Sequence, residues 1–170
     1  MNYTIDRAKV EDAKDLIEYL KIITGESNNL TITPKQVKEL NVKDEGLIID
    51  SYNHSPTSIM LVAKLNKEII GMGSLKGYNI DSIIGHRVSL GVSVKKDYWN
   101  KGIGREIIDA LLSYAANNEY IEIVELEVKS DNYAAISLYE RFGFEEIGFF
   151  ENYFKYEDGY GDAILMTLQF

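Results

Sequence analysis

A strand, a loop with two glycines, a helix and a second strand follow one another between residues 87 and 128, and this succession constrains the fold most. In the first strand, apolar residues alternate with small or polar ones: Val88, Leu90, Val92 and Val94. The helix, expected from Gly104 to Asn118, spaces its apolar residues three and four apart: Ile107, Ile108, Leu111, Leu112 and Ala115. Two strands of one sheet that are joined by a helix lie parallel. The sequence therefore predicts a sheet with a parallel pair.

The rest of the chain predicts mostly antiparallel strands. Strands are expected over residues 3–7, 59–65, 68–75, 144–156 and 162–170, and helices over 10–23 and 132–142. A further helix opens at Thr33, where Pro34 and Gln36 complete a capping signature, but the mixed pattern from Asn41 to Pro56 assigns it no end. No linker, repeat or low-complexity segment interrupts the pattern. We therefore expect one α/β domain over residues 1–170 with a mixed sheet.

Composition excludes several kinds of function. The net charge of −9 argues against binding to nucleic acid or an anionic membrane and favours cationic partners. The chain has no cysteine, which excludes disulfides, thiolate metal sites and a cysteine nucleophile. Its two histidines, His54 and His86, lie 32 positions apart, so no metal is expected. No apolar run approaches the ~18 residues that span a bilayer, and the N-terminus does not resemble a secretion signal, so we expect a cytoplasmic protein.

The loop after the central strand has the features of an anion site. Gly102 and Gly104 flank one residue at the start of the helix, where backbone N–H groups can turn toward a bound anion. Positions 95–105 carry four cationic residues and one acidic residue, a net of +3 in a chain of −9. Ile107 stands where a dinucleotide motif has its third glycine, and no P-loop triplet is present. Taken alone, the loop predicts a phosphate site or simply a turn with a solvated basic rim.

Two motifs resemble the GNAT superfamily of N-acetyltransferases. Trp99-Asn100-Lys101-Gly102-Ile103-Gly104 resembles the acyl-coenzyme A signature R/Q-x-x-G-x-G/A, with Trp99 in place of Arg or Gln. The segment from Asn132 through Tyr139 to Gly143-Phe144 resembles the family's downstream motif. The resemblance implies a mostly antiparallel sheet of six to seven strands with a splayed parallel pair and helices on both faces. It also implies transfer of an acetyl group from acetyl-coenzyme A to an amine without a covalent enzyme intermediate.

The resemblance assigns the cofactor contacts residue by residue. It implies that the pyrophosphate is held by the backbone amides of Asn100, Lys101, Gly102, Ile103, Gly104 and Arg105. The basic side chains Lys95, Lys96, Lys101 and Arg105 are candidates for the 3′-phosphate. The pantetheine arm is expected along Val92, Ser93 and Val94, where the strand splays near a bulge, with Val92 N–H as the oxyanion donor. Asn132 and Ala135 are the other implied contacts.

Tyr139 is the expected general acid. It lies seven positions after Asn132, two helical turns on, so both side chains share a face, and a phenol can protonate a departing thiolate. Its alternative role is an aromatic anchor of the core. The general base stays open, because Val88 stands where some family members have Glu. The alternatives are His86, Glu125, Glu127, Glu26, Asp44, Glu45 or ordered water.

The acceptor is expected to be a cationic primary amine of a small molecule or of a protein or peptide N-terminus. An acidic chain with 12 Tyr suits such an acceptor, and exposed aromatic residues suggest a homodimer. The missing acid at Val88 motivates an alternative, a non-catalytic module that binds acyl-coenzyme A on the same fold. A third possibility is an interaction domain that binds no cofactor.

Overall fold

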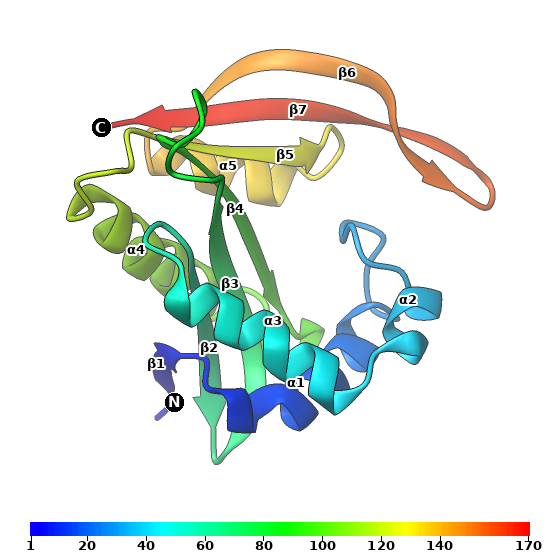
Figure 1. The fold of residues 1–170 in the computed structure, drawn as a ribbon. Helices are drawn as coiled ribbons and strands as arrows, with labels where there is room; N and C mark the ends of the chain where they lie inside the picture. Colours follow the sequence, from blue (N-terminus) through cyan, green and yellow to red (C-terminus); the bar gives the residue numbers. More distant parts are fainter.

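The computed structural model describes residues 1–170 as a seven-stranded sheet covered by helices (Figure 1). The strands are β1 (Thr4–Arg7), β2 (Ile59–Leu65), β3 (Glu68–Gly77), β4 (Arg87–Val94), β5 (Ile123–Lys129), β6 (Glu145–Tyr156) and β7 (Gly159–Gln169). The helices are α1 (Ala13–Ile23), α2 (Pro34–Glu39), α3 (Val42–His54), α4 (Ile103–Ala116) and α5 (Tyr133–Arg141), with short 3-10 turns η1 (Val10–Asp12) and η2 (Lys96–Tyr98). The strand order is β1-β2-β3-β4-β5-β7-β6, which confirms the expected mixed sheet.

The sheet divides where β4 meets β5. This parallel pair has three residue pairs, from Arg87–Ile123 to Ser89–Glu125. Beyond them β4 continues along β3 as far as Val94, and β5 continues along β7 as far as Lys129. Figure 1 shows the two strands diverging. The expected splay is therefore confirmed.

The bulge expected beside this splay is absent. The register between β3 and β4 runs without a shift from Gly77–Val88 to Gly71–Val94. Register shifts occur instead between β2 and β3 and between β6 and β7. The splay arises because each strand follows its antiparallel neighbour, so no inserted residue is needed to separate them.

Hydrophobic residues fill both sides of the sheet. The larger core lies under α4 and α5 and contains the apolar stripe predicted for α4, with Ile107, Ile108 and Leu111 fully buried. The smaller core lies under α1 and α3 and includes Tyr19 and Ile49. Alternation along β4 sends Val88 and Leu90 into the larger core and leaves Gly91 and Ser93 on the opposite face. Helices thus cover both faces, as expected.

Helix α3 is the element that the sequence did not predict. Its apolar pattern is interrupted by Gly46 and by polar residues, which obscured the helical period. The Asn41 side chain caps the helix by accepting from Asp44 N–H at 2.9 Å. Gly46 fits because a Cβ there would lie 3.3 Å from Val10 Cγ1. Close packing against η1 therefore offsets the weak helical tendency of glycine.

The capping signature at the start of α2 is confirmed. Thr33 Oγ1 accepts from Gln36 N–H at 3.2 Å, and Thr33 N–H donates to Gln36 Oε1 at 2.9 Å. Pro34 occupies the first turn. The helix ends after Glu39, so α2 and α3 are separate.

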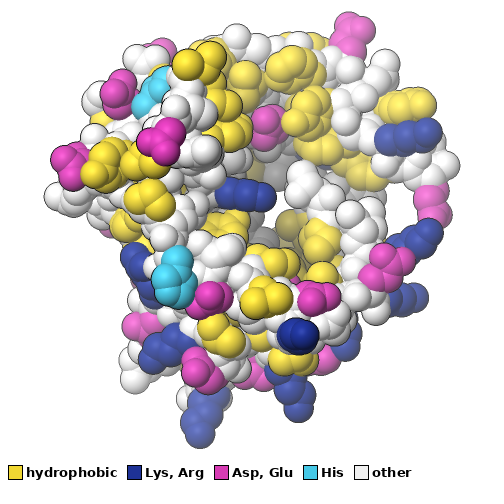
Figure 2. Space-filling view, viewed as in Figure 1, with side chains coloured by type: hydrophobic (Ala, Val, Ile, Leu, Met, Phe, Trp, Pro, Cys, Tyr) yellow, Lys and Arg dark blue, Asp and Glu magenta, His cyan; other side chains and the backbone are white.

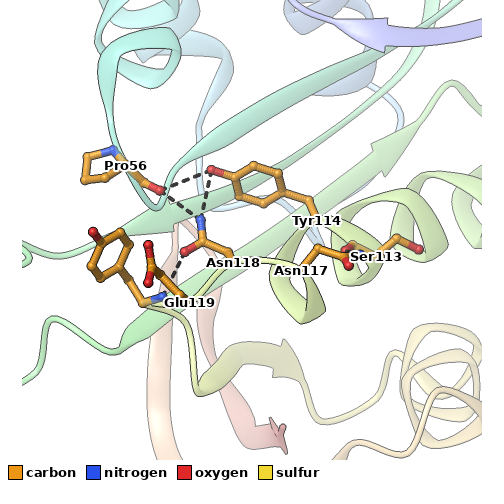
Figure 3. A pocket seen from close by; sticks show the side chains of 7 residues that line it. Pro56, Ser113, Tyr114, Asn117, Asn118 and Glu119 are labelled. Atoms are coloured by element: carbon orange, nitrogen blue, oxygen red, sulfur yellow. Dashed lines mark hydrogen bonds between the residues drawn. The ribbon is translucent and has the colours of Figure 1, made fainter.

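Polar contacts anchor the loop that follows α3. The Pro56 carbonyl accepts hydrogen bonds from Tyr114 Oη at 3.3 Å and Asn118 Nδ2 at 2.8 Å, beside a surface pocket (Figure 3). This pocket lies at the C-terminal end of α4. A 14-residue helix is about 21 Å long, so the pocket is far from the glycine loop at the other end.

Candidate active site

The second half of β4 has a free edge. Lys95 N–H donates to Ile70 O of β3 at 2.9 Å. Because N–H groups alternate in direction along a strand, those of Val94 and Val92 point away from β3. Strand β5 has already diverged on that side, since its pairing with β4 ends at Ser89. Two backbone donors therefore face the space between the diverging strands.

The loop after β4 is fixed by side chains that were not assigned this role from the sequence. Trp99 Nε1 donates to Val94 O at 2.7 Å, which ties the loop to the end of the strand. Lys101 Nζ donates to Asp97 O at 2.7 Å and lies 5.1 Å from the centre of the Tyr98 ring. The tryptophan that departs from the family signature thus has a structural task in the backbone of the loop.

The start of α4 presents a row of unpaired backbone donors. None of the N–H groups of residues 100–105 donates to an acceptor of the protein, and the helical pattern begins with Glu106 N–H donating to Gly102 O at 3.0 Å. Gly102 has a φ of +86°, and a Cβ there would meet nothing within 4 Å. At Gly104 a Cβ would lie 3.7 Å from Val94 Cγ2. Free donors at the positive end of a helix fit a diphosphate.

The four basic side chains of this loop differ in their availability. Lys95 is 6% exposed and pairs with Glu68 at 2.5 Å, with its Nζ 6.0 Å from the centre of the Tyr19 ring. The interpretation of Lys95 as a 3′-phosphate contact is therefore wrong, because burial and an ion pair turn it to the other face of the sheet. Lys96 and Arg105 are exposed and form no ion pair.

Helix α5 brings Asn132, Ala135 and Tyr139 to one side. Asn132 Oδ1 accepts from Ala135 N–H at 3.3 Å, so this asparagine also caps the helix. The Tyr139 ring is 7% exposed and packs against Phe144 with ring centres 5.7 Å apart. Its hydroxyl has no hydrogen-bond partner within the protein, and burial raises the pKa of Tyr139 to about 12. The ring anchors the core while the hydroxyl stays protonated and unpartnered.

On the α1 and α3 side of the sheet, the diverging strands border a hollow. Figure 2 shows this hollow between the β6–β7 region and the α1–α3 region, with acidic, basic and apolar side chains around it. Gly91 is exposed and contributes no side chain on this face of the sheet. Beside it, a 2.9 Å hydrogen bond joins the Ser93 and Tyr19 hydroxyls. The structure thus brings a buried tyrosine of α1 to the free half of β4.

Two glutamates of β5 share this face but differ in their partners. Glu125 accepts from Arg87 Nε at 2.8 Å and from Tyr78 Oη at 3.0 Å. Glu127 lies one step further along β5, past the last β4–β5 pair, is exposed and forms no ion pair. Burial and then the charge of Glu127 raise the pKa of Tyr153, which places this phenol beside it. Glu125 therefore meets a cation, whereas Glu127 forms no ion pair and has the Tyr153 hydroxyl beside it.

The other candidates for the base lie in different surroundings. Val88 is completely buried under α4, so its side chain points away from the face that carries Gly91 and Ser93. Glu26 Oε2 accepts from Lys96 N–H at 2.8 Å, which links the end of α1 to the cofactor loop. Asp44 is exposed at the start of α3, and Glu45 beside it is 4% exposed. The His86 carbonyl accepts two hydrogen bonds, from Glu122 N–H and Ile123 N–H, at the start of β4.

Two further properties concern cofactors and membranes. No group of three or more His, Asp or Glu side chains lies close enough together to hold a metal ion. No helix combines the length and the apolar character needed to cross a membrane.

Comparison with known proteins places this geometry in a family. The profile of the acetyltransferase (GNAT) family matches residues 27–144. Ribosomal protein bS18-alanine N-acetyltransferase of Escherichia coli (strain K12) is 32% identical over 105 residues, which cover 61% of this chain and 70% of that protein. The N-alpha-acetyltransferase of Saccharolobus solfataricus is 27% identical over 169 residues, which cover 98% of this chain and 92% of that protein.

Solved structures share the fold. An acetyltransferase of the GNAT family from Streptococcus pneumoniae has a TM-score of 0.95 at 24% identity, covering 99% of this chain and 100% of that one. The acetyltransferase yncA from Salmonella typhimurium, solved with its cofactor acetyl-CoA, has a TM-score of 0.85 at 18% identity, covering 99% of this chain and 94% of that one.

The splayed sheet and the row of free N–H groups at the end of the diverging strand belong to the fold that these solved acetyltransferases share. The chain belongs to the acetyltransferase (GNAT) family, whose members use acetyl-coenzyme A, and it is an N-acetyltransferase. The resemblance drawn from the two sequence motifs is therefore confirmed.

Proposed function

We propose that this protein transfers the acetyl group of acetyl-coenzyme A to a primary amine by direct attack within a ternary complex. The proposal rests on the combination of two features, a free β4 edge and six unpartnered N–H groups in the loop that follows it. A thioester cofactor with a diphosphate needs both features. No cysteine is present to form an acyl-enzyme, which agrees with direct transfer.

The cofactor contacts follow from these donors. We propose that the amides of residues 100–105 bind the diphosphate and that Lys96 and Arg105 are the side chains free to approach the 3′-phosphate. The pantetheine arm would lie against Val92, Ser93 and Val94 as an added strand. On the other side it would meet Asn132 and Ala135 at the start of α5.

Each bond change and proton transfer of the acetyl transfer can be assigned to a group of this site. The amine nitrogen attacks the thioester carbonyl, the C–N bond forms and the C–S bond breaks. Val92 N–H, directed into the splay, is the proposed donor to the carbonyl oxygen, and one such donor typically contributes ~10²–10³ in rate. Tyr139 gives its proton to the departing thiolate, for which a phenol that stays protonated at neutral pH is suited. The proton lost by the amine passes to a base on the acceptor side.

Glu127 is the base that the geometry supports best. It shares a face of β5 with Glu125 but lies beyond the last β4–β5 pair, where the strands separate. Glu125 is held by an ion pair with Arg87 and a hydrogen bond from Tyr78, so its carboxylate oxygens already have partners. A carboxylate that acts directly or through one water therefore completes the set of groups that the reaction needs.

The alternative of a non-catalytic binding module loses its motivation. It rested on Val88, which lacks an acid at a position where some family members have Glu. Because Val88 is fully buried on the α4 side, an acid at this position could not face the acceptor.

The proposal also covers the amine acceptor, the cellular compartment and the oligomeric state. The named relatives that act on protein α-amino groups support a peptide N-terminus as the acceptor, and an acidic chain also suits a small cationic amine. We propose the cytoplasm as the compartment. A homodimer would use β6 at the edge of the sheet, where Ile147, Phe149 and Phe150 are exposed.

The test is a thiol-release assay with acetyl-coenzyme A and a panel of N-terminal peptides, polyamines, amino acids and amine antibiotics. We expect at least one amine to release coenzyme A, and acetyl-coenzyme A to raise the melting temperature. Tight cofactor binding without transfer to any amine would instead support the binding module.

A further inference from the structure

Glu45 is a buried acid without a partner. It is 4% exposed, and its carboxylate takes part in no hydrogen bond and no ion pair. The two fully buried side-chain atoms without partners are Asn53 Oδ1 and Thr57 Oγ1, so the Glu45 oxygens keep some contact with solvent. A carboxylate that is largely removed from water and unpaired is destabilising. A bound ligand that supplies the missing partner would offset this cost.

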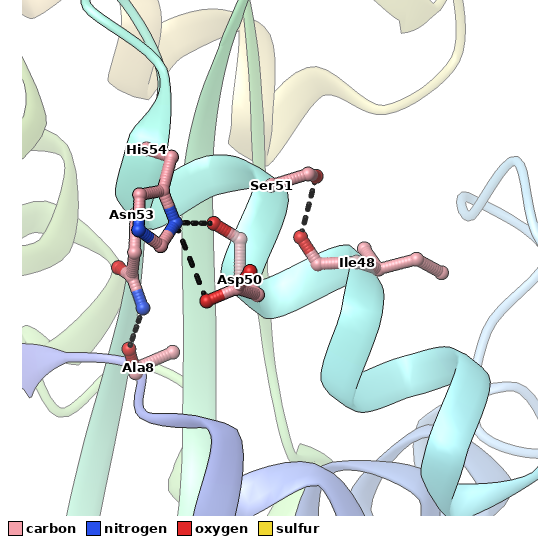
Figure 4. A network of polar contacts seen from close by, with 6 residues as sticks. All are labelled: Ala8, Ile48, Asp50, Ser51, Asn53 and His54. Carbon is pink, nitrogen blue, oxygen red and sulfur yellow. Dashed lines mark hydrogen bonds and ion pairs between the residues drawn. The ribbon is translucent and has the colours of Figure 1, made fainter.

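The contacts of α3 show which way Glu45 faces. At about 100° per residue, Gly46 and Asn53 share one flank of the helix, whereas Glu45 and Tyr52 share the other. The first flank faces the start of the chain, because Asn53 Nδ2 donates to Ala8 O at 3.1 Å (Figure 4) and Gly46 packs on η1. Glu45 and Tyr52 lie about 100° away around the helix, on the flank where Tyr52 lies near Ser74 of β3.

That second flank lies on the side of α3 nearer β3. Burial and, to a smaller extent, the charge of Glu45 raise the pKa of Tyr52, whereas the Ser74 hydroxyl of β3 lowers it, so this phenol lies near both side chains. Ser74 pairs across the sheet with Gly91, an exposed glycine in the half of β4 that has left β5. Glu45, Tyr52 and Ser74 thus lie near one another on the β3 side of the free half of β4, whereas Glu127 belongs to β5 on the other side.

We propose that Glu45 is a specificity-determining residue that binds a second cationic group of the acceptor, distinct from the amine that is acetylated. The proposal rests on the proposed function and narrows its substrate class to amines that carry a further ammonium or guanidinium group. A cation supplies the partner that the buried carboxylate lacks, and the Tyr52 hydroxyl adds a polar neighbour. Small diamines and peptides with a basic side chain near the N-terminus share this chemistry.

Matched acceptors test the charge without changing the shape. We would compare 1,4-diaminobutane with butylamine, and the dipeptide amide Ala-Lys with Ala-norleucine, by thiol release at saturating acetyl-coenzyme A. We expect kcat/KM to be about 10- to 100-fold higher for the dicationic member of at least one pair, the range for a hydrogen bond to a charged group. The pair that shows the preference identifies a small-molecule or a peptide source.

Glu45→Gln keeps the shape and removes the charge, and Asp44→Asn is a control with the same charge change at the exposed neighbouring position. We expect Glu45→Gln to abolish the dicationic preference, to leave the monoamine rate within about threefold, and to keep or raise the melting temperature because an unpaired buried charge is removed. Asp44→Asn should keep the preference. No preference in the natural protein, or one that survives Glu45→Gln, would overturn the proposal while leaving the acetyltransferase intact.

A binding measurement separates this proposal from the chemistry. With coenzyme A present, 1,4-diaminobutane should bind to the natural protein, as measured by calorimetry, and at least tenfold more weakly to Glu45→Gln. If no amine is acetylated, the proposed function fails, yet this comparison still decides the role of Glu45. Equal affinity for the two proteins would refute it.

Discussion

Replacing Tyr139 by Phe removes one hydroxyl and leaves the packing of the ring in place. The ring contacts Phe144 in the larger core, and the hydroxyl has no hydrogen-bond partner in the protein. We therefore expect no loss of stability at neutral pH. If the hydroxyl protonates the leaving thiolate, kcat should fall by about 10²–10⁴, the usual contribution of a general acid. Affinity for acetyl-coenzyme A should change by less than about threefold.

The same substitution has a signature in the alkaline stability of the protein. The pKa of Tyr139 is raised from 10.0 to about 12, so the folded state holds this proton more tightly than the unfolded chain. The resulting stability is fully present below pH 10 and is lost between pH 10 and 12. The free energy of unfolding should fall by about 3 kcal/mol in total over this range, and by about 1 kcal/mol of that by pH 11. The Phe variant should lack this part of the decline.

Two measurements check the reasoning. Steady-state kinetics by thiol release, with calorimetric titration of acetyl-coenzyme A, separate turnover from binding. Urea unfolding at pH 8 and pH 11 gives the free energies for both proteins. Equal losses in turnover and cofactor affinity would contradict the role as an acid, and parallel alkaline declines would show that Tyr139 is not desolvated as described.

Three further substitutions test other parts of the site. Gly104→Asp should abolish the rise in melting temperature that acetyl-coenzyme A causes, because a carboxylate there repels a diphosphate. The variant should still fold, since a Cβ has room at this position and an acid is favourable at the start of a helix. If acetyl-coenzyme A still raised the melting temperature, the diphosphate would not bind in this loop. Glu127→Gln should lower kcat by about 10²–10⁴ with cofactor affinity unchanged, and full activity would leave water or another group as the base. Tyr19→Phe removes the hydrogen bond to Ser93 and should lower kcat/KM for acetyl-coenzyme A by about 3- to 10-fold, the effect of one modest hydrogen bond on the alignment of the free strand. A Tyr19→Phe, Ser93→Ala double variant should then be no worse than either single variant, and additive losses would show that the bond does not position the strand.

Local signals in the sequence were enough for most elements and for the glycine-containing turn that opens α4. The alternation of Val88, Leu90, Val92 and Val94 and the helical stripe after Gly104 are short-range patterns, and the structure places both as predicted. The bounds of α3 were not predicted, because its helical period is broken and its formation depends on packing against η1. A glycine inside a helix is stabilised by contacts that lie far away in the chain.

The roles of individual polar side chains were decided by tertiary contacts. Lys95 and Lys96 are neighbours with the same charge, yet one is buried against Glu68 and the other is exposed. Glu125 and Glu127 share one face of β5, but only the first meets Arg87. Such differences depend on which strands lie next to each other and where β4 and β5 part.

The sequence by itself determined the strand–helix–strand unit, the glycines that open the start of α4, and the family, because each depends on residues close together along the chain. The tertiary structure decided which N–H groups are free, which of the two β5 glutamates meets a cation, and that Glu45 is buried without a partner. These properties depend on distances between segments far apart in the sequence, and desolvation and pairing follow from those distances rather than from residue type.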